Sequence, residues 1–429
     1  MSLVRPFCAR MYRHESGADL SALAAPPYDV VSAEDRAALL ARDPHNVVAL
    51  ELPDGPLDPD APGNRYETGA ETWRRWHDEG VLVEDDSPAI YVVEQSWEHE
   101  GRHVRRRGFV AAVELHPFSD GVVLPHERTL PKAISDRLNL TRSTAANLSQ
   151  VFGLFSDPAG ETDSLFEAAI GMEVDCSATD TEGVVSRMWA VRDVEAIETI
   201  STIISSRSIF IADGHHRYTT ALAYRDERRA ADAAAGLSPV DPAYDFVMMT
   251  LVNMDDPDLV VLPTHRLARA EGTFDADAFW AGLATHFDIS EFACSPADAI
   301  ARAGSTAMVV RTADGTMRLA SVKEGTDTAD IITGAHSAAW KRLDVTVLQE
   351  LILKPLLGID PDVPATLDRL SFAKKESDAL ASDADVAFLL AATRMDQLRE
   401  VALAGETMPQ KSTYFYPKLA SGLLMRSLA

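Results

Sequence analysis

The alternation of apolar and polar positions first marks a short buried strand that leads directly into a helix. Residues 208–212 form an apolar run, and from residue 216 to about 229 the pattern is helical, with Tyr218 and Leu222 on one side. The dipeptide Asp213-Gly214 separates the two elements. A strand, a tight turn and a helix in this order are typical of the ligand-binding edge of an α/β sheet. The turn is therefore the first place to expect a site.

The same pattern predicts further elements that alternate along the chain. Helices are expected from Ser32 to about Arg42, where Ser32 and Asp35 form a capping box, from Tyr66 to Gly80, from Asp344 to about Leu357, and after Thr393, which would cap that helix with Asp396. Strands are expected at 89–95 and 104–115 as a hairpin, at 246–252, near 307–311 and 317–321, and at 386–391. The fold class is therefore α/β, of the mixed α+β kind.

The length of the chain favours more than one core. At 429 residues it exceeds what a single core usually organises. We predict a core α/β domain over residues 1–268, which carries the Asp-Gly turn, and a C-terminal α/β region over 269–429 whose tail returns to the site.

The net charge narrows the class of partner that we expect, and the cysteine content indicates the cellular compartment. The net charge is −26 and the pI about 4.8, so the surface repels nucleic acid and anionic lipid, and we expect neither as a partner. The three cysteines are far apart in the sequence, which disfavours disulfides and zinc sites and suits a reducing cytoplasm. No signal peptide or membrane-spanning window is visible, so a soluble, cytoplasmic protein is expected. The sequence does not indicate the oligomeric state.

The run from Asp213 to Tyr218 is the first candidate for chemistry. Gly214 lets the backbone approach a ligand closely, and Arg217 offers a planar fork for two phosphate oxygens. Asp213 could hold a metal or act as a base, and His215 or His216 could be a general base. The alternative is a turn whose Asp caps the helix and whose histidines are structural. Five consecutive polar or glycine residues after a buried strand make us favour a functional site.

Two further runs carry charged groups. His126-Glu127-Arg128-Thr129, followed by Lys132 and by Asp136-Arg137, could bind a phosphate, a metal or a protonatable substrate. Leu130, however, stands where a zinc protease motif has its second His. A solvated loop is an equally good interpretation of this run. Residues 408–413 end in Lys411-Ser412-Thr413, but they lack the glycines of a P-loop. They could supply ammonium groups to an anion, together with Lys418, or could simply be a tail that packs on the core.

The chain as a whole resembles a known family. The runs that carry the resemblance, in order, are Arg5-Pro6-Phe7, residues 25–32, residues 126–129, Ile211 to Tyr218, Leu343-Asp344-Val345, and residues 408–413 with Pro417-Lys418 and Ser421-Gly422-Leu423. They are similar to the domain-of-unknown-function 1015 family of bacterial and archaeal proteins, across essentially the whole chain. That family has no settled activity, so membership does not assign a function.

The Asp-Gly-His-His-Arg turn is also similar to a turn of the ParB and sulfiredoxin superfamily, which includes nucleotide-binding switches, sulfiredoxins and free-serine kinases. This resemblance implies a ParB/sulfiredoxin-like core with large insertions and a C-terminal α/β extension. It also implies phosphate contacts from Gly214, His215, His216 and Arg217.

These observations lead to three hypotheses. The first is nucleotide-dependent phosphotransfer involving a small hydroxylated metabolite, for example serine or phosphoserine, with ATP or ADP and Mg²⁺ as cofactors. Its catalytic candidates are Asp213, His215, His216, Glu127 and His126, and its phosphate-binding candidates are Gly214, Arg217, Lys411, Ser412, Thr413, Lys418 and Arg128. The second is a metal-dependent phosphoester hydrolase with His126, Glu127, Asp213 and His215 as ligands, and the third is a non-catalytic nucleotide-binding switch. All three expect a small phosphorylated ligand and require the three motifs to meet in one cleft.

Overall fold

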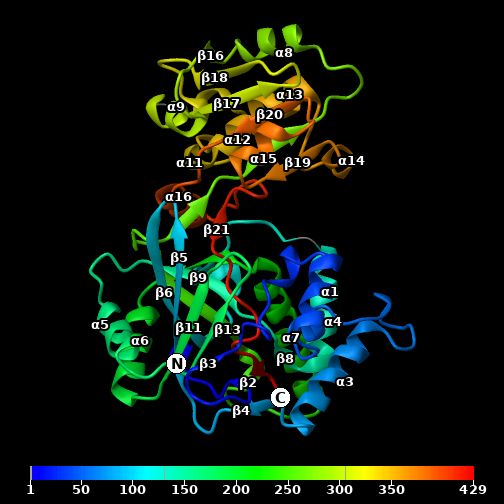
Figure 1. Ribbon diagram of the computed structural model, residues 1–429, viewed down its shortest axis with the longest axis vertical. Coiled ribbons are helices and arrows are strands. Elements are labelled where there is room, and N and C mark those ends of the chain that lie inside the picture. The colour runs from blue at the N-terminus through cyan, green and yellow to red at the C-terminus, as the bar shows by residue number, and fades with distance from the viewer. Residues whose placement is uncertain (1, 130, 305) are drawn as a thin grey trace. The chain divides into compact units, whose positions relative to one another are not determined.

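The computed structural model describes residues 2–129, 131–304 and 306–429 (Figure 1). Contacts divide the chain into two compact units. The first comprises the chain up to Pro125, Thr129–Leu259 and Pro417–Ala429, and the second comprises His126–Arg128 and Val260–Tyr416. The division at residues 268 and 269 that the sequence suggested stays a prediction.

A large mixed β-sheet organises the first unit (Figure 1). Its strands are β1 (Val4–Arg5), β3 (Ala18–Asp19), β5 (Ile90–His99), β6 (Arg102–Glu114), β7 (Val123–Leu124), β9 (Val151–Phe155), β10 (Cys176–Thr179), β11 (Val185–Val191), β12 (Ile209–Asp213) and β13 (Phe246–Asn253). Their order is β3-β10-β11-β5-β6-β13-β9-β12-β7, with β1 beside β6. The pairs β3/β10, β7/β12 and β9/β13 are parallel, and the other pairs are antiparallel.

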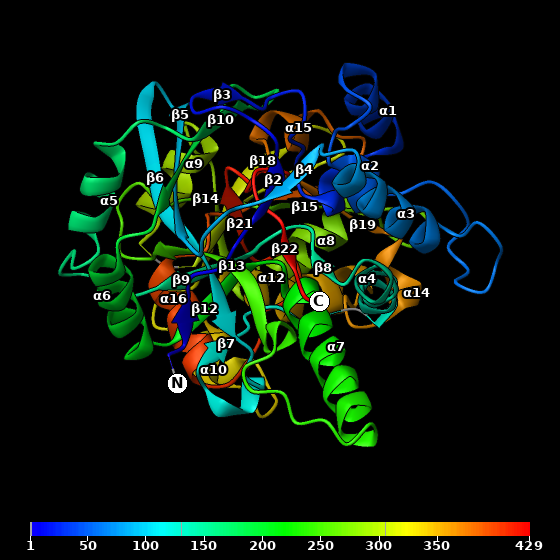
Figure 2. The ribbon, with the colours of Figure 1, turned by 90° about the horizontal axis from the view of Figure 1, so that it is seen from below.

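Helices and short strands surround this sheet (Figure 2). They are α1 (Ala33–Arg42), α2 (Val48–Glu51), α3 (Arg65–Asp78), α4 (Pro131–Thr144), α5 (Asp163–Ile170), α6 (Val194–Ser205) and α7 (His215–Ala234), with the strand pairs β2 (Arg10–Tyr12)/β4 (Leu82–Glu84) and β8 (Ala146–Asn147)/β22 (Arg426–Ser427). Alternate residues of a strand face opposite sides of a sheet. On β13, Val247, Met249 and Leu251 accordingly pack in one cluster with side chains of α5 and α6, while Met248 packs in another. The central strands are therefore apolar on both faces, as expected of a covered sheet.

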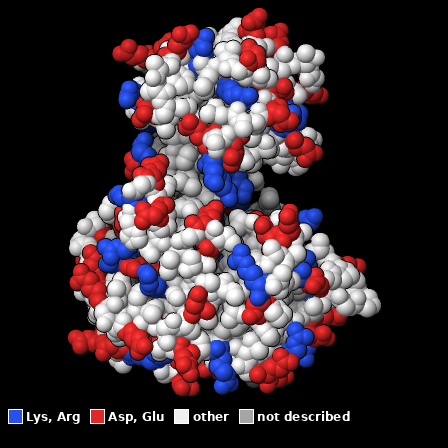
Figure 3. Space-filling view, viewed as in Figure 1, with Lys and Arg blue, Asp and Glu red and all other residues white. Residues whose placement is uncertain are grey.

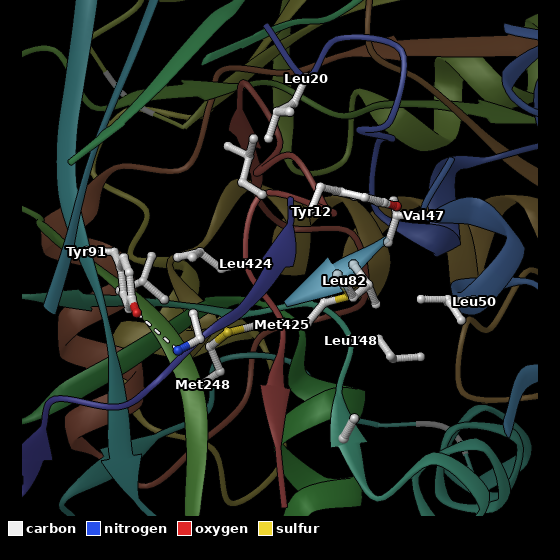
Figure 4. Packing of buried hydrophobic residues seen from close by; sticks show 14 of the residues in the cluster. Tyr12, Leu20, Val47, Leu50, Leu82, Tyr91, Leu148, Met248, Leu424 and Met425 are labelled. Carbon is white, nitrogen blue, oxygen red and sulfur yellow. Dashed lines mark hydrogen bonds between the residues drawn. The ribbon is translucent and has the colours of Figure 1, made fainter. Parts of the chain in front are cut away.

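The second of these clusters joins segments far apart in the sequence (Figure 4). Tyr12 and Leu50 pack there with Leu424 and Met425 of the C-terminal segment. The backbone N–H of Ala9 donates a hydrogen bond of 3.0 Å to the buried Tyr91 hydroxyl, and the phenol thereby keeps a partner inside the core. Residues 417–429 are therefore an integral part of the first unit.

A second sheet forms the core of the second unit. Its order is β16 (Phe287–Ser290), β18 (Met317–Val322), β17 (Ala307–Thr312), β20 (Val386–Leu389), β15 (His265–Ala268) and β19 (Leu370–Ala373), and a separate pair joins β14 (Val260–Leu262) to β21 (Tyr414–Tyr416). The helices are α8 (Ala276–Leu283), α9 (Pro296–Arg302), α10 (Thr328–Ile331), α11 (Ala338–Lys341), α12 (Asp344–Leu348), α13 (Lys354–Leu357), α14 (Pro364–Leu367), α15 (Glu376–Ala381) and α16 (Met395–Leu403). The mixed α/β class is thus confirmed.

Local predictions are confirmed where short-range chemistry decides them. The Ser32 hydroxyl accepts a hydrogen bond of 3.1 Å from the Asp35 backbone, which completes the expected capping box. The expected box of Thr393 and Asp396 is wrong, because the Thr393 hydroxyl instead donates to the Ser412 carbonyl at 2.7 Å. A distant carbonyl has replaced the local partner.

The distribution of surface charge and the length of the helices are relevant to the partners that the protein could have. Figure 3 shows Lys and Arg side chains scattered among Asp and Glu over the face in view. Within the described part of the chain, none of the helices is both long enough and apolar enough to cross a bilayer.

Candidate functional site

The junction between β12 and α7 forms the centre of the candidate site. The pairing of β12 with β9 shifts register between Ile211 and Asp213, and such a bulge re-aims the end of a strand. Gly214 follows with φ +87°, a left-handed conformation that favours glycine, and α7 begins at the next residue. A Cβ added to Gly214 would lie 2.9 Å from Arg217 Nε. The absence of a side chain therefore lets this guanidinium lie directly against the turn.

Two cations share the Asp213 carboxylate. Arg217 Nη2 lies 2.8 Å from Oδ2, and Lys418 Nζ lies 2.6 Å from Oδ1. The side chains are 17% exposed for Asp213, 12% for Arg217 and 15% for Lys418, so the cluster is largely desolvated. Burial opposes ionisation of Asp213, but Lys418 and Arg217 outweigh it and hold the pKa of that carboxyl well below its usual range. Asp213 is thus an anion that holds both cations in place.

A buried arginine supports the segment that carries Lys418. Arg106 is 2% exposed and lies over the Phe152 ring at 4.8 Å. Its guanidinium donates to the Pro417 carbonyl at 2.6 Å and to the Gln95 side chain, and Gln95 in turn donates to the Lys418 carbonyl at 3.1 Å. Burial lowers the pKa of Arg106 to about 9, against the opposing effect of Asp213. Arg106 therefore adds positive charge behind the cluster as well as fixing Lys418.

A third arginine brings α2 and α4 to the same region. Arg137 donates to the Glu51 carbonyl at 2.8 Å, lies 3.5 Å from Glu51 Oε2 and bonds Asp136 through two nitrogens. It also lies over the Tyr28 ring at 4.2 Å. Burial raises the pKa of Tyr28 to about 12, and Arg217 and Arg137 oppose that shift. Tyr28 and Glu51 thus lie within electrostatic range of Arg217, and the two groups of charges act on each other.

Two cavities adjoin these charged residues. The larger, about 140 Å³, has mainly apolar walls that include Ala25, Leu39, Val184 and Leu419, and Lys418 forms part of its lining. The smaller, about 40 Å³, has mixed walls, in which apolar side chains alternate with polar and charged ones that include Arg217. Ligand space of two different characters thus flanks the cations.

The other two candidate motifs contact each other within the second unit. His126 Nε2 lies 2.8 Å from the Thr413 hydroxyl, and the Lys411 backbone N–H donates to Glu127 at 3.2 Å. Lys411 has φ +58°, and Arg266 donates to its carbonyl at 2.9 Å. The predicted proximity of the His-Glu and Lys-Ser-Thr runs is thus present in the structure.

The remaining predicted residues are Arg128, Ser412, His215 and His216, and of these His215 helps to lower the pKa of Asp213. Arg128 makes an exposed pair with Asp362 at 3.5 Å, and the Ser412 hydroxyl donates to the Pro409 carbonyl. His215 is buried and His216 half-buried in the first turn of α7. The prediction that all three motifs share one cleft stays a prediction, as do the catalytic and phosphate-binding roles. Among the described side chains, no group of three or more His, Cys, Asp or Glu is arranged to hold a metal ion.

The sequence pattern missed Glu51, Arg106 and Gln150 as members of the site. Gln150 accepts from Arg217 through its backbone carbonyl, which no side-chain motif can reveal. For Glu51 a signal did exist, because it is the charged residue of the short apolar element Val48–Glu51 and is buried there. For Arg106 none existed, because Arg105 and Arg107 stand beside it in the same strand and only the fold shows which of them is buried. A buried charge of this kind calls for a partner.

Comparison with known proteins gives the family. The model of the family described as protein of unknown function (DUF1015) matches residues 4–346. The chain belongs to this family. The resemblance seen in its motifs is thereby confirmed for DUF1015, and no curated protein matches the chain.

Solved structures similar to this DUF1015 chain are distant. A free serine kinase in complex with AMP is 13% identical with a TM-score of 0.32, over 72% of this chain and 86% of that one. SbnI with a C-terminal truncation, from Staphylococcus aureus, is 10% identical with a TM-score of 0.35, over 73% and 86% of the two chains. A conserved hypothetical protein from Pyrococcus furiosus is 13% identical with a TM-score of 0.32, over 72% and 92%. Likeness at this level carries no argument about the site.

Proposed function

We propose that this DUF1015 protein binds a nucleotide at the Asp213–Arg217–Lys418 cluster and transfers a phosphoryl group to or from a small hydroxylated metabolite, for example serine or phosphoserine. The observation that carries the proposal is the pair of largely desolvated cations at the β12–α7 junction. A ParB/sulfiredoxin-like core, which the turn suggests, fits the same proposal.

The charge at this junction suits a phosphate group. Arg217 and Lys418 share one carboxylate, so the three side chains carry one excess positive charge, and Arg106 lies behind them. Helix α7 begins beside the same residues, and a helix amino terminus attracts anions through its dipole and its free backbone N–H groups. Desolvation strengthens each of these attractions. In a chain of net charge −26, such a positive point gives local selectivity for an anion.

The larger cavity suits the nucleoside. Its apolar walls would accept a planar base, and Lys418, which both lines the cavity and contacts Asp213, would connect the base to the phosphates. We expect ATP or ADP with Mg²⁺, which would spread the developing negative charge during transfer. With its depressed pKa, Asp213 orients the cations or holds Mg²⁺, and His215 or His216 remains the candidate base for the hydroxyl.

The test compares two arginines on one helix. Thermal shift and calorimetry are measured with ATP, ADP, CTP and pyrophosphate, with and without Mg²⁺, for the wild type, Arg217→Ala and Arg229→Ala. Arg229 lies farther along α7 in an exposed pair with Asp245, so its variant controls for loss of an ion pair from that helix. A ligand at a hundredfold excess over its Kd should stabilise the wild type and Arg229→Ala by about 3 kcal/mol, but not Arg217→Ala.

Two results would overturn the proposal. One is nucleotide binding that is unchanged in Arg217→Ala, and the other is a folded wild type that binds neither nucleotide nor pyrophosphate. Transfer of labelled γ-phosphate to serine, or from phosphoserine to ADP, then tests catalysis directly. Tight nucleotide binding with no transfer to any hydroxylated metabolite would instead support the nucleotide-binding switch.

A further inference from the structure

The smaller cavity of the first unit has an unusual combination of charged walls. It has a volume of about 40 Å³ and lies between α2, α4, the segment after α4 and α7. Glu51, Arg137, Arg217 and Thr220 line it together with apolar side chains such as Leu140. Since Arg217 also bonds Asp213, the cavity adjoins the cation cluster without including Lys418.

Three polar atoms of these walls are buried and unsatisfied. Within the described chain, Glu51 Oε1, Arg217 Nε and the Thr220 hydroxyl have no hydrogen-bond partner. Glu51 is 4% exposed and Thr220 is 3% exposed. The other Glu51 oxygen lies 3.5 Å from the Arg137 guanidinium. That guanidinium is shared with Asp136, which lies closer, at 2.6 Å. A buried carboxylate oxygen without a donor is costly, so its presence calls for a complementary group.

The unsatisfied atoms differ in the kind of ligand group that each would bind. A carboxylate oxygen only accepts hydrogen bonds, whereas a guanidinium nitrogen only donates them. An anion such as phosphate would satisfy Arg217 but would be repelled by Glu51, and a simple cation would have the reverse problem. A molecule that carries both an ammonium group and a carboxylate satisfies both atoms with charge-assisted hydrogen bonds. The Thr220 hydroxyl is then available to a polar side chain of the same molecule.

We infer that this cavity binds a small zwitterionic α-amino acid, with its ammonium group on Glu51 and its carboxylate on Arg217. In naming the phosphoryl acceptor, the inference rests on the proposed function. The binding step itself needs no nucleotide and is measured alone.

The experiment titrates the full chain with four matched compounds. L-Serine and L-alanine carry both charges, glycolate lacks the ammonium group, and ethanolamine lacks the carboxylate. Calorimetry should detect binding of L-serine and L-alanine, and at least tenfold weaker binding of glycolate and ethanolamine. Equal binding of either single-charge compound, or no binding of any zwitterion by folded protein, would overturn the inference.

Variants locate the binding. Glu51→Gln keeps the shape of the side chain but removes its charge, so L-serine should bind at least tenfold more weakly. Glu227→Gln is the matched control, because Glu227 makes an exposed pair with Arg142 outside the cavity, and it should bind like the wild type. Wild-type affinity in Glu51→Gln would refute the assignment.

A second variant and a second ligand protect the result from misfolding. Thr220→Val, which preserves shape, should reduce the preference for L-serine over L-alanine, and an unchanged preference would count against Thr220 as a contact. Retained binding of L-alanine reports that Thr220→Val is folded, and an unchanged urea midpoint reports the same for Glu51→Gln. Amino-acid binding without phosphoryl transfer would refute the proposed function alone, whereas nucleotide binding without amino-acid binding would refute this inference alone.

Discussion

Gly214→Ala tests whether the turn positions the Arg217 guanidinium. Gly214 has φ +87°, and an added Cβ would lie 2.9 Å from Arg217 Nε and 3.0 Å from both Cζ and Nη2. All three atoms belong to the group that bonds Asp213 and the Gln150 carbonyl. The substitution therefore strains the backbone and forces the guanidinium away from its partners.

The two effects can be estimated separately. A left-handed conformation costs an alanine about 1–2 kcal/mol. Complete loss of one partner from a buried ion pair costs about 3–5 kcal/mol, and a displaced guanidinium would lose part of that. We expect Gly214→Ala to lower the free energy of unfolding by about 3–5 kcal/mol in total.

A second glycine isolates the contribution of the contact. Gly236, which follows α7, has φ +72°, and an added Cβ would meet no atom within 4 Å. Gly236→Ala should therefore lose only the backbone term, about 1–2 kcal/mol. Urea unfolding at neutral pH gives both values, and calorimetry with pyrophosphate should show weakened binding for Gly214→Ala only. Equal losses of stability in the two variants would refute the argument that glycine is needed for the guanidinium.

Two further predictions concern the second unit. Burial raises the pKa of Asp344 to about 6, above its value of about 3.9 in an unfolded chain, so stability should fall by up to ~3 kcal/mol as pH rises from about 4 to 6. Urea midpoints measured across this pH range should fall in the wild type and not in Asp344→Asn. If the midpoints of the two proteins changed with pH in the same way, the prediction would be wrong. Thr413→Val removes the hydroxyl 2.8 Å from His126 Nε2 and should cost about 1 kcal/mol, which an unchanged thermal midpoint would exclude.

The parts of the fold that the sequence predicted are those that neighbouring residues determine. The β12–α7 unit follows from an apolar run, a glycine that must be left-handed and a helical pattern, all within one short stretch. The hairpin of β5 and β6 likewise follows from two runs of β-forming residues around Gly101, which has φ +74°. Neither element needed information from elsewhere in the chain.

The partners within the site depend on tertiary pairing and could not be predicted. Gln95 and Arg106 lie opposite each other because of the register between β5 and β6, and a shift by one residue would turn one of them to the other face. Lys418 reaches Asp213 across 205 positions of sequence. Thr393 shows the same limit, because a carbonyl of the distant Ser412 outcompeted the local cap.

The C-terminal segment has a consequence for how the protein is made. Leu424 and Met425 belong to the core of the first unit, and Arg426 donates to the Phe246 carbonyl at 3.0 Å. A ribosome therefore synthesises the whole of residues 260–416 before the segment that completes the first unit can emerge. Until then the nascent chain exposes apolar surface that chaperones recognise. Completion of the first unit thus waits until residues 417–429 have been synthesised, and a chain truncated before Pro417 should keep that apolar surface exposed.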